Sequence, residues 1–173
     1  MKKKTIIISK IISGGQTGAD RGGLDAAIAM KIPHGGWCPK DRKAEDGVIP
    51  SRYRLKEIKS SFYQERTKKN VVDSDATIVF CFGKASGGSE LTVEYARQYK
   101  KPVLVIDLDK EEDHAEKIST WLEQRVAARL LADTEKDWTP PMKITLNVAG
   151  SRESEAPGIQ ENVRKIMLLA LNS

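Results

Sequence analysis

The amino-acid sequence predicts an α/β protein in which a mostly parallel β-sheet lies between two layers of helices. Its 173 residues are the usual size of one domain, so residues 1–173 are expected to form a single domain. Short apolar runs rich in β-branched residues alternate with longer segments whose apolar residues recur at a spacing near 3.6. Such alternation is typical of parallel sheets that carry helices on both faces.

The expected elements alternate along most of the chain. Buried strands are predicted at residues 5–13, 76–82, 103–108 and 143–149. Helical patterns cover residues 20–30, 61–72, 90–99, 115–132 and 158–171. Residues 31–54 are rich in Pro, Gly and charge, so they predict a long surface loop with a brief strand near Trp37. The basic content of this loop suggests that it lies over a ligand.

The beginning of the sequence has to be distinguished from a secretory signal. Met1-Lys2-Lys3-Lys4 precedes an apolar run, but Lys10 interrupts that run and no small-residue cleavage pattern follows. We therefore expect a buried first strand and a cytoplasmic protein. The two cysteines give no disulfide framework, and with only two histidines no metal site is expected. Cys81 lies in an apolar run and is predicted to be a core residue.

The charges are unevenly distributed, although the formal net charge is only +5. Acidic residues gather at 107–116. Basic residues gather in an earlier stretch that comprises Lys40, Arg42, Lys43, Arg52, Arg54, Lys56, Lys59, Arg66, Lys68 and Lys69. A positive field of this kind attracts phosphorylated ligands or nucleic acid, but a solvated basic face without a partner explains the charge equally well.

A glycine-rich segment lies directly between the first strand and the first helix. Glycines allow a close approach of the backbone, and free N–H groups at a helix start favour an anion. Ser13 replaces the first glycine of a dinucleotide fingerprint, and no Gly-Lys-Ser/Thr follows as in a P-loop. The candidate ligand-binding residues here are Gly14, Gly15, Gln16, Thr17, Gly18, Asp20 and Arg21.

Two more loops of this kind follow later strands. The first supplies Ser86, Gly87, Gly88, Ser89, Thr92 and Glu94. The second supplies Asn147, Gly150, Ser151 and Arg152. The carboxyl ends of parallel strands share one edge of a sheet, where ligands bind in such folds. The three loops are therefore predicted to form one pocket for a phosphate group.

Several of these residues also have a purely structural interpretation. Asp20 can orient a ligand hydroxyl or cap the first helix. Arg152 can clamp a phosphate or pair with Glu153 or Glu155. Glu94 can act as a general base or compensate the helix dipole.

The three tryptophans are interpreted differently from one another. Trp121 and Trp138 are expected to pack in the core. Trp37 lies beside Gly35-Gly36 in the basic loop, and it is the tryptophan that we consider for stacking on a ligand.

Several stretches of the sequence resemble the molybdenum-carrier (molybdenum cofactor carrier-like) family. They are residues 11–21, Gly36-Trp37-Cys38-Pro39, Arg66-Thr67 with Asn70-Val71, residues 73–77, and Asn147-Val148-Ala149-Gly150 with Pro157-Gly158-Ile159. The resemblance spans nearly the whole chain. It implies a Rossmann-like three-layer sandwich of the superfamily that also contains lysine-decarboxylase-like phosphoribohydrolases and DNA-processing proteins. It also implies a homo-oligomer and, as ligand, the molybdenum cofactor (molybdopterin), a phosphorylated pterin.

The phosphoribohydrolase signature Pro-Gly-Gly-x-Gly-Thr-x-x-Glu falls on residues 86–94. Gly87, Gly88 and Glu94 fit, but Glu90-Leu91 replaces Gly-Thr. A side chain then stands where a phosphate or ribose would approach, which speaks against nucleotide hydrolysis and leaves binding without turnover open.

Three hypotheses follow, in order of preference. The first is a non-catalytic carrier or sensor that binds molybdenum cofactor or a nucleotide, with the loops around the phosphate and Trp37, Arg66 and Asn70 framing the rest. The second is a nucleotide N-glycosidase that uses Glu94. The third is single-stranded nucleic-acid binding through the basic stretch.

Overall fold

A computed structural model describes residues 4–60, 62–133 and 135–172. Its central feature is a five-stranded sheet in the order β2-β1-β9-β7-β8. All four strand pairings are parallel. The strands are β1 (Ile6–Ile12), β2 (His34–Gly35), β7 (Ala76–Cys81), β8 (Val103–Asp107) and β9 (Met142–Gly150).

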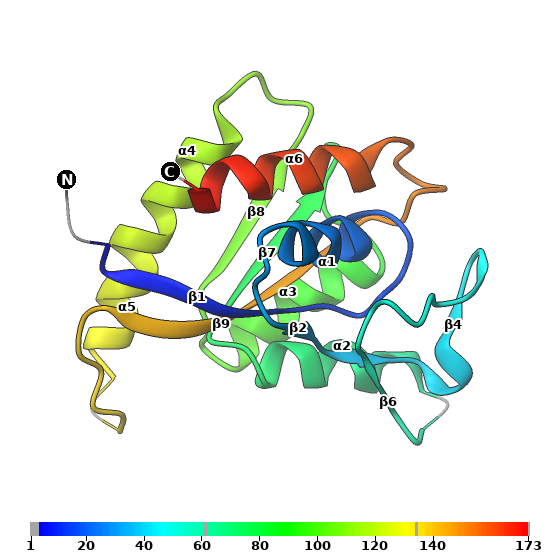
Figure 1. Cartoon of the computed structure of the whole chain (residues 1–173), viewed down its shortest axis with the longest axis horizontal. Coiled ribbons are helices and arrows are strands. Elements are labelled where there is room, and N and C mark those ends of the chain that lie inside the picture. Colours follow the sequence, from blue (N-terminus) through cyan, green and yellow to red (C-terminus); the bar gives the residue numbers. More distant parts are fainter. Residues whose placement is uncertain (1–3, 61, 134, 173) are drawn as a thin grey trace.

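Helices cover both faces of this sheet, which confirms the predicted three-layer α/β sandwich (Figure 1). On one face, α6 (Ile159–Asn172) packs against α1 (Ala19–Ala29) and against α4 (His114–Trp121). A π-helical turn, η2 (Leu122–Val126), continues α4 into α5 (Ala127–Leu131). On the other face, α2 (Tyr63–Val72) packs against α3 (Gly88–Gln98).

The core lies between the sheet and the helices. All six residues of β7 are buried, and inward-facing residues of β9 such as Ile144, Leu146 and Val148 are fully buried as well. Cys81 belongs to this interior, as predicted. Trp121 and Trp138 pack against the core, which confirms their expected structural role.

β9 lies at the centre of the sheet although it follows every other strand in the sequence. It pairs with β1 through contacts such as Ile11↔Leu146 and with β7 through Ile78↔Val148. The helix that follows β9 and the helix that follows β7 lie on opposite faces of the sheet. The carboxyl ends of β9 and β7 therefore flank a topological switch point, the usual place for a ligand in such sheets.

The segment between α1 and α2 is more ordered than the surface loop expected for residues 31–54. β2 joins the main sheet, β3 (Trp37–Cys38) pairs with β6 (Lys56–Glu57), and β4 (Lys43–Ala44) forms a hairpin with β5 (Gly47–Val48) after the turn η1 (Lys40–Arg42). A small second core holds the segment together: Leu24, Cys38, Ile49 and Tyr53 are buried there. The brief strand near Trp37 is confirmed.

Most predicted elements end within a residue or two of their observed positions. The helix expected at residues 90–99 begins earlier, at Gly88, so the glycine pair forms its first turn. Ser61, the expected first residue of the helix at 61–72, lies outside the described residues, as do residues 1–3, which begin the Met1-Lys2-Lys3-Lys4 run. None of the described helices combines the length and the apolar character that a membrane crossing requires.

Candidate functional site

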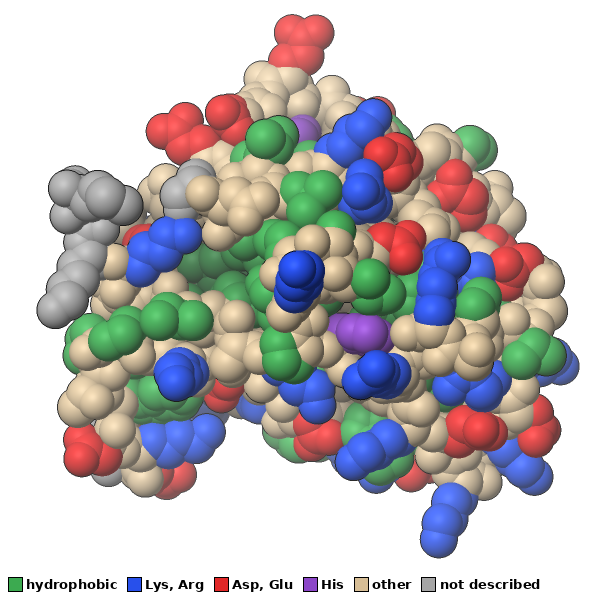
Figure 2. Space-filling view, in the orientation of Figure 1, with side chains coloured by type: hydrophobic (Ala, Val, Ile, Leu, Met, Phe, Trp, Pro, Cys, Tyr) green, Lys and Arg blue, Asp and Glu red, His purple; other side chains and the backbone are tan. Residues whose placement is uncertain are grey.

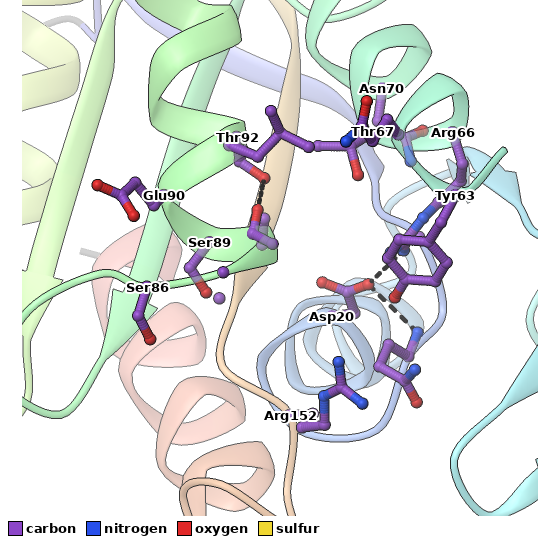
Figure 3. A pocket seen from close by; sticks show the side chains of 18 of the residues that line it. Asp20, Tyr63, Arg66, Thr67, Asn70, Ser86, Ser89, Glu90, Thr92 and Arg152 are labelled. Atoms are coloured by element: carbon purple, nitrogen blue, oxygen red, sulfur yellow. Dashed lines mark hydrogen bonds and ion pairs between the residues drawn. The ribbon is translucent and has the colours of Figure 1, made fainter.

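A cavity of about 570 Å³ opens at the carboxyl edge of the sheet (Figure 3). The loops after β1, β7 and β9 form three of its sides, and α2 forms the fourth. The structure brings fourteen of the predicted residues to its lining: Gly14, Gln16, Asp20, Arg66, Asn70, Ser86, Gly87, Gly88, Ser89, Thr92, Glu94, Asn147, Gly150 and Arg152.

The start of α3 presents an open stretch of backbone to this cavity. Gly87 precedes the helix with a positive φ of 53°, and no side chain of the described residues caps the helix. Within residues 4–60, 62–133 and 135–172, the N–H groups of Gly87 and Gly88 have no acceptor. A Cβ added at either glycine would meet no atom within 4 Å in the part of the chain that the structure describes. This first turn therefore offers unpaired amides and free space to an anion.

A buried ion pair forms the opposite wall. Arg66 Nη1 lies 3.1 Å from Asp20 Oδ2, and both side chains are only 8% exposed. The same Asp20 oxygen accepts a hydrogen bond from the Gln16 amide at 3.2 Å, so Asp20 fastens the first loop and does not cap α1. Burial raises the pKa of Asp20, and the charge of Arg66 opposes this rise.

Gly14 makes this arrangement possible because the guanidinium lies directly against its backbone. A Cβ at Gly14 would stand 1.6 Å from Arg66 Nη1 and 2.8 Å from Asp20 Oδ2. Any side chain at this position would displace the ion pair from the cavity wall.

Arg152 lies at the rim below Asp20 (Figure 3). Its guanidinium pairs with Glu155 at 3.3 Å and reaches Glu45 at 4.0 Å, so the pairing with Glu155 considered from the sequence occurs. The side chain is still 42% exposed. Arg152 therefore retains a free surface on the cavity side.

Several hydrogen-bond donors of the first glycine-rich loop are already paired with acceptors of the protein itself. The Thr17 amide donates to Gln16 Oε1 at 3.0 Å, and the Ala19 amide donates to the Ser151 carbonyl at 3.1 Å. The Thr17 hydroxyl donates to Glu45. Six predicted residues lie outside the cavity lining: Gly15, Thr17, Gly18, Arg21, Trp37 and Ser151.

Trp37 faces a different environment from the one expected. Its indole N–H donates to Asp73 Oδ2 at 2.7 Å, and the Lys69 ammonium lies 4.2 Å from the ring centroid. The residue borders a second, smaller cavity of about 160 Å³ together with Lys10, Arg54 and other residues. Asn70 links Trp37 to the main site, because its amide group pairs with the backbone N–H and C=O of Trp37.

Much of the basic stretch has structural partners. Arg42 donates to the carbonyl groups of Ile49, Pro50, Tyr53 and Leu55. On the face shown in Figure 2, lysines and arginines are interspersed with acidic side chains and do not gather into one continuous patch. Among the described residues, no group of three or more His, Cys, Asp and Glu side chains is arranged to hold a metal ion.

Seven lining residues were not among the sequence candidates: Tyr63, Gln64, Thr67, Glu90, Leu91, Ala149 and Glu155. One signal in the sequence points to the α2 wall. Residues 63, 66, 67 and 70 follow the i, i+3, i+4, i+7 spacing of one helix face, yet all four are polar or amphipathic. Arg66, Thr67 and Asn70 are nevertheless buried.

Comparisons with known proteins agree with this architecture. The model of the circularly permutated YpsA SLOG family matches residues 11–171. A crystal structure from Syntrophus aciditrophicus SB, named "Putative molybdenum carrier protein", is 41% identical in sequence. The match covers 99% of this chain and 98% of that one, with a TM-score of 0.82. No curated protein matches the chain. The resemblance to molybdenum carriers inferred from the sequence is thereby confirmed.

Proposed function

We propose that this chain, which belongs to the circularly permutated YpsA SLOG family, is a carrier protein. Its ligand is a phosphorylated small molecule, either molybdenum cofactor or a nucleotide, which it binds in the cavity at the carboxyl edge of the sheet. The name of the related crystal structure supports a carrier role with a molybdenum-containing cargo.

The start of α3 carries this proposal. The unpaired amides of Gly87 and Gly88 point to a phosphate because a helix start combines hydrogen-bond donors with a partial positive charge. Arg152 adds a partly exposed guanidinium at the same cavity. Figure 3 shows Glu90 directed away from the Asp20 side of the cavity, so its carboxylate leaves the centre free.

Direct binding measurements test the proposal. Calorimetric titration under anaerobic conditions with molybdopterin, and with a panel of nucleotides, is expected to give at least one dissociation constant below millimolar. Millimolar affinity already corresponds to about 4 kcal/mol. If no compound of the panel binds more tightly than this, the carrier proposal is wrong.

A charge placed at Gly88 makes the test specific for the α3 turn. Gly88→Asp adds a side chain into open space, and an acid at a helix start does not disturb the helix. Its carboxylate would repel a phosphate and compete for the amides, so we expect affinity to fall more than tenfold, since charge-assisted hydrogen bonds contribute about 1.5–3 kcal/mol each. Gly88→Asn is the matched neutral control and should lose much less. Equal losses in the two variants would contradict the role of charge.

Glycosidase activity remains a second candidate because Glu94 lines the same cavity. This alternative predicts release of free base from nucleoside monophosphates, detectable by chromatography, and loss of that release in Glu94→Gln. Binding without base release would instead agree with the carrier function.

A further inference from the structure

The α2 wall of the cavity has features that the phosphate site alone does not explain. Arg66, Thr67 and Asn70 are 7%, 8% and 4% exposed, respectively, and all three line the cavity. Tyr63 lies on the same helix face and is 40% exposed. In Figure 3, this wall lies across the cavity from the α3 turn, with Tyr63 in front of Arg66.

Tyr63 is held by a rigid support. The Arg66 guanidinium carbon lies 4.4 Å from the centroid of the Tyr63 ring, within the range of a cation–π contact. Asp20 holds the guanidinium in an ion pair at 3.1 Å, and the guanidinium fills the space beside the bare backbone of Gly14. One part of the aromatic ring is thus supported while another part remains open to the cavity.

We propose that Tyr63 is the surface on which a flat heteroaromatic ring of the ligand stacks, while the ligand phosphate binds at the α3 turn. This inference rests on the proposed function, because it assigns the ring and the phosphate to opposite sides of one cavity. It selects phosphorylated purines and pterins over sugar phosphates and inorganic oxyanions.

Asp20 supplies a polar complement to such a ring. The bonds from Arg66 and Gln16 both meet at Oδ2. Figure 3 shows the other carboxylate oxygen directed toward the cavity. A carboxylate oxygen accepts hydrogen bonds, so it suits an amino group or a ring N–H, both of which guanine and pterin rings carry.

The inference is tested by calorimetric titration with four probes: a pterin monophosphate, GMP, ribose 5-phosphate and inorganic phosphate. At least one of the two ring-bearing probes should bind about tenfold or more tightly than ribose 5-phosphate, because stacking on an aromatic side chain is worth about that much. Tyr63→Ala should remove this preference and leave the weak binding of ribose 5-phosphate unchanged. Tyr63→Phe retains the ring and should retain the preference.

Phe62→Ala is the matched control, because Phe62 is the adjacent aromatic residue, is 77% exposed and does not line the cavity. It should bind all four probes as the wild type does. Equal binding of ring-bearing probes and ribose 5-phosphate would overturn the stacking role and leave the carrier proposal standing. The same holds for equal losses in Tyr63→Ala and Phe62→Ala. Failure of molybdopterin, the nucleotides and all four probes to bind would overturn both proposals.

Discussion

The Asp20–Arg66 pair shapes the cavity wall but adds little to the stability of the fold. A buried ion pair recovers little more than the desolvation of its two charges, whereas loss of one partner leaves an uncompensated charge in the interior. Here the uncompensated group would be Asp20, whose pKa is already raised by burial even with Arg66 beside it. The pair is therefore better understood as a device that fixes the shape of the site than as a source of stability.

Replacement of Arg66 by Met should destabilise the protein by about 3 kcal/mol near neutral pH, since it breaks a buried pair. The folded-state pKa of Asp20 lies above its ordinary value of 3.8, so Asp20 takes up protons on folding and its contribution to stability declines as the pH rises above 3.8. Without Arg66 this pKa rises further, because the opposing charge is gone. The difference in unfolding free energy between wild type and variant should therefore be small near pH 4 and grow toward pH 7.

Denaturant unfolding at several pH values measures this difference. Arg164→Met provides the control, because Arg164 pairs with Glu161 on the exposed side of α6 with side-chain exposures of 37% and 55%. Such a surface pair contributes about 0.5 kcal/mol or less at any pH. If the unfolding free energy of Arg66→Met were lower than that of the wild type by the same amount at every pH, the charge of Arg66 would not affect the pKa of Asp20 as described.

At the level of single residues, the sequence was informative where the backbone geometry is distinctive. Gly87 and Gly88 could be recognised because only glycines leave a helix start so open. Tyr63 could not be recognised, because an amphipathic aromatic residue at the start of a helical pattern is as compatible with packing as with ligand binding. Its partner Arg66 was one of many basic residues in the same stretch, so nothing in the sequence linked the two. Trp37 was chosen for stacking by its neighbours in sequence, whereas its spatial neighbours are Lys69 and Asp73.

Among the elements, the β4–β5 hairpin is connected to its surroundings through two carboxylates at its turn. Glu45 at its tip accepts hydrogen bonds from Thr17 and from Ser154, whose hydroxyl lies 2.6 Å away. The adjacent Asp46 forms a bidentate pair with Arg21 at 2.6 and 2.8 Å. Glu45 thus connects the hairpin to the first loop and to the loop after β9, and Asp46 connects it to the start of α1.

The double variant Glu45→Gln, Asp46→Asn should loosen this hairpin at neutral pH. Amide hydrogen exchange of residues 43–48 is expected to accelerate, while the midpoint of thermal unfolding changes little because the hairpin lies outside the main core. Glu161→Gln on α6 is a suitable control for an acid removed elsewhere. Unchanged exchange at the hairpin would show that backbone pairing alone holds it.

The same hairpin should respond to acid in the wild-type protein. Although burial acts to raise it, hydrogen bonds from Ser154 and Thr17 hold the pKa of Glu45 below its ordinary value of 4.5. Hydrogen bonds from Arg21 hold the pKa of Asp46 below 3.8. The stabilisation is present above these ordinary values and is lost as the pH falls through the lower folded-state values. Hydrogen exchange measured along a descending pH series, corrected for intrinsic rates, checks this.

The element pattern was predictable where hydrophobic periodicity is strong and not where side chains give no periodic signal. β1, β7, β8, β9 and the helices follow from apolar spacing. β2 consists of only His34 and Gly35, too few residues for a pattern, and it exists because Ile11 and Ile12 offer it a sheet edge. The small core around Tyr53 escaped notice because its members are widely separated in sequence.

The arrangement of the whole molecule differs from that of an ordinary doubly wound sheet in one respect, namely the place of the central strand and its helix in the sequence. β9 and α6 occupy the centre of the sheet and one of its covering layers, positions that an unpermuted doubly wound sheet would fill with its first strand and helix. The strand list alone could not reveal this, because the sequence specifies which segments are strands and not which neighbours they choose. Lys4 Nζ lies 3.3 Å from the Leu171 carbonyl, so β1 begins beside the end of α6.

A rearranged chain tests this view of the topology. A variant that runs from Asp137 to Asn172, then through a short Gly-Ser linker to Lys4 and on to Lys136, places β9 first and keeps every strand pairing. Because the joined residues are close and the new ends are exposed, we expect cooperative unfolding and unchanged ligand affinity. Circular dichroism and calorimetry measure both. A matched variant opened inside β9, between Leu146 and Asn147, should fail to fold, and equal behaviour of the two would contradict the central role of β9.

The late position of β9 has a consequence during protein synthesis. The β1–β2 pair and the β7–β8 pair leave the ribosome first, each with one bare inner edge, and neither edge meets its proper neighbour until residues 142–150 have been translated. Bare edges invite pairing with other chains. The nascent polypeptide therefore passes through an interval in which two inner strand edges are bare, whereas a version beginning with β9 could pair β1 with β9 as soon as β1 was translated and would leave only the β7-facing edge of β9 waiting for its neighbour.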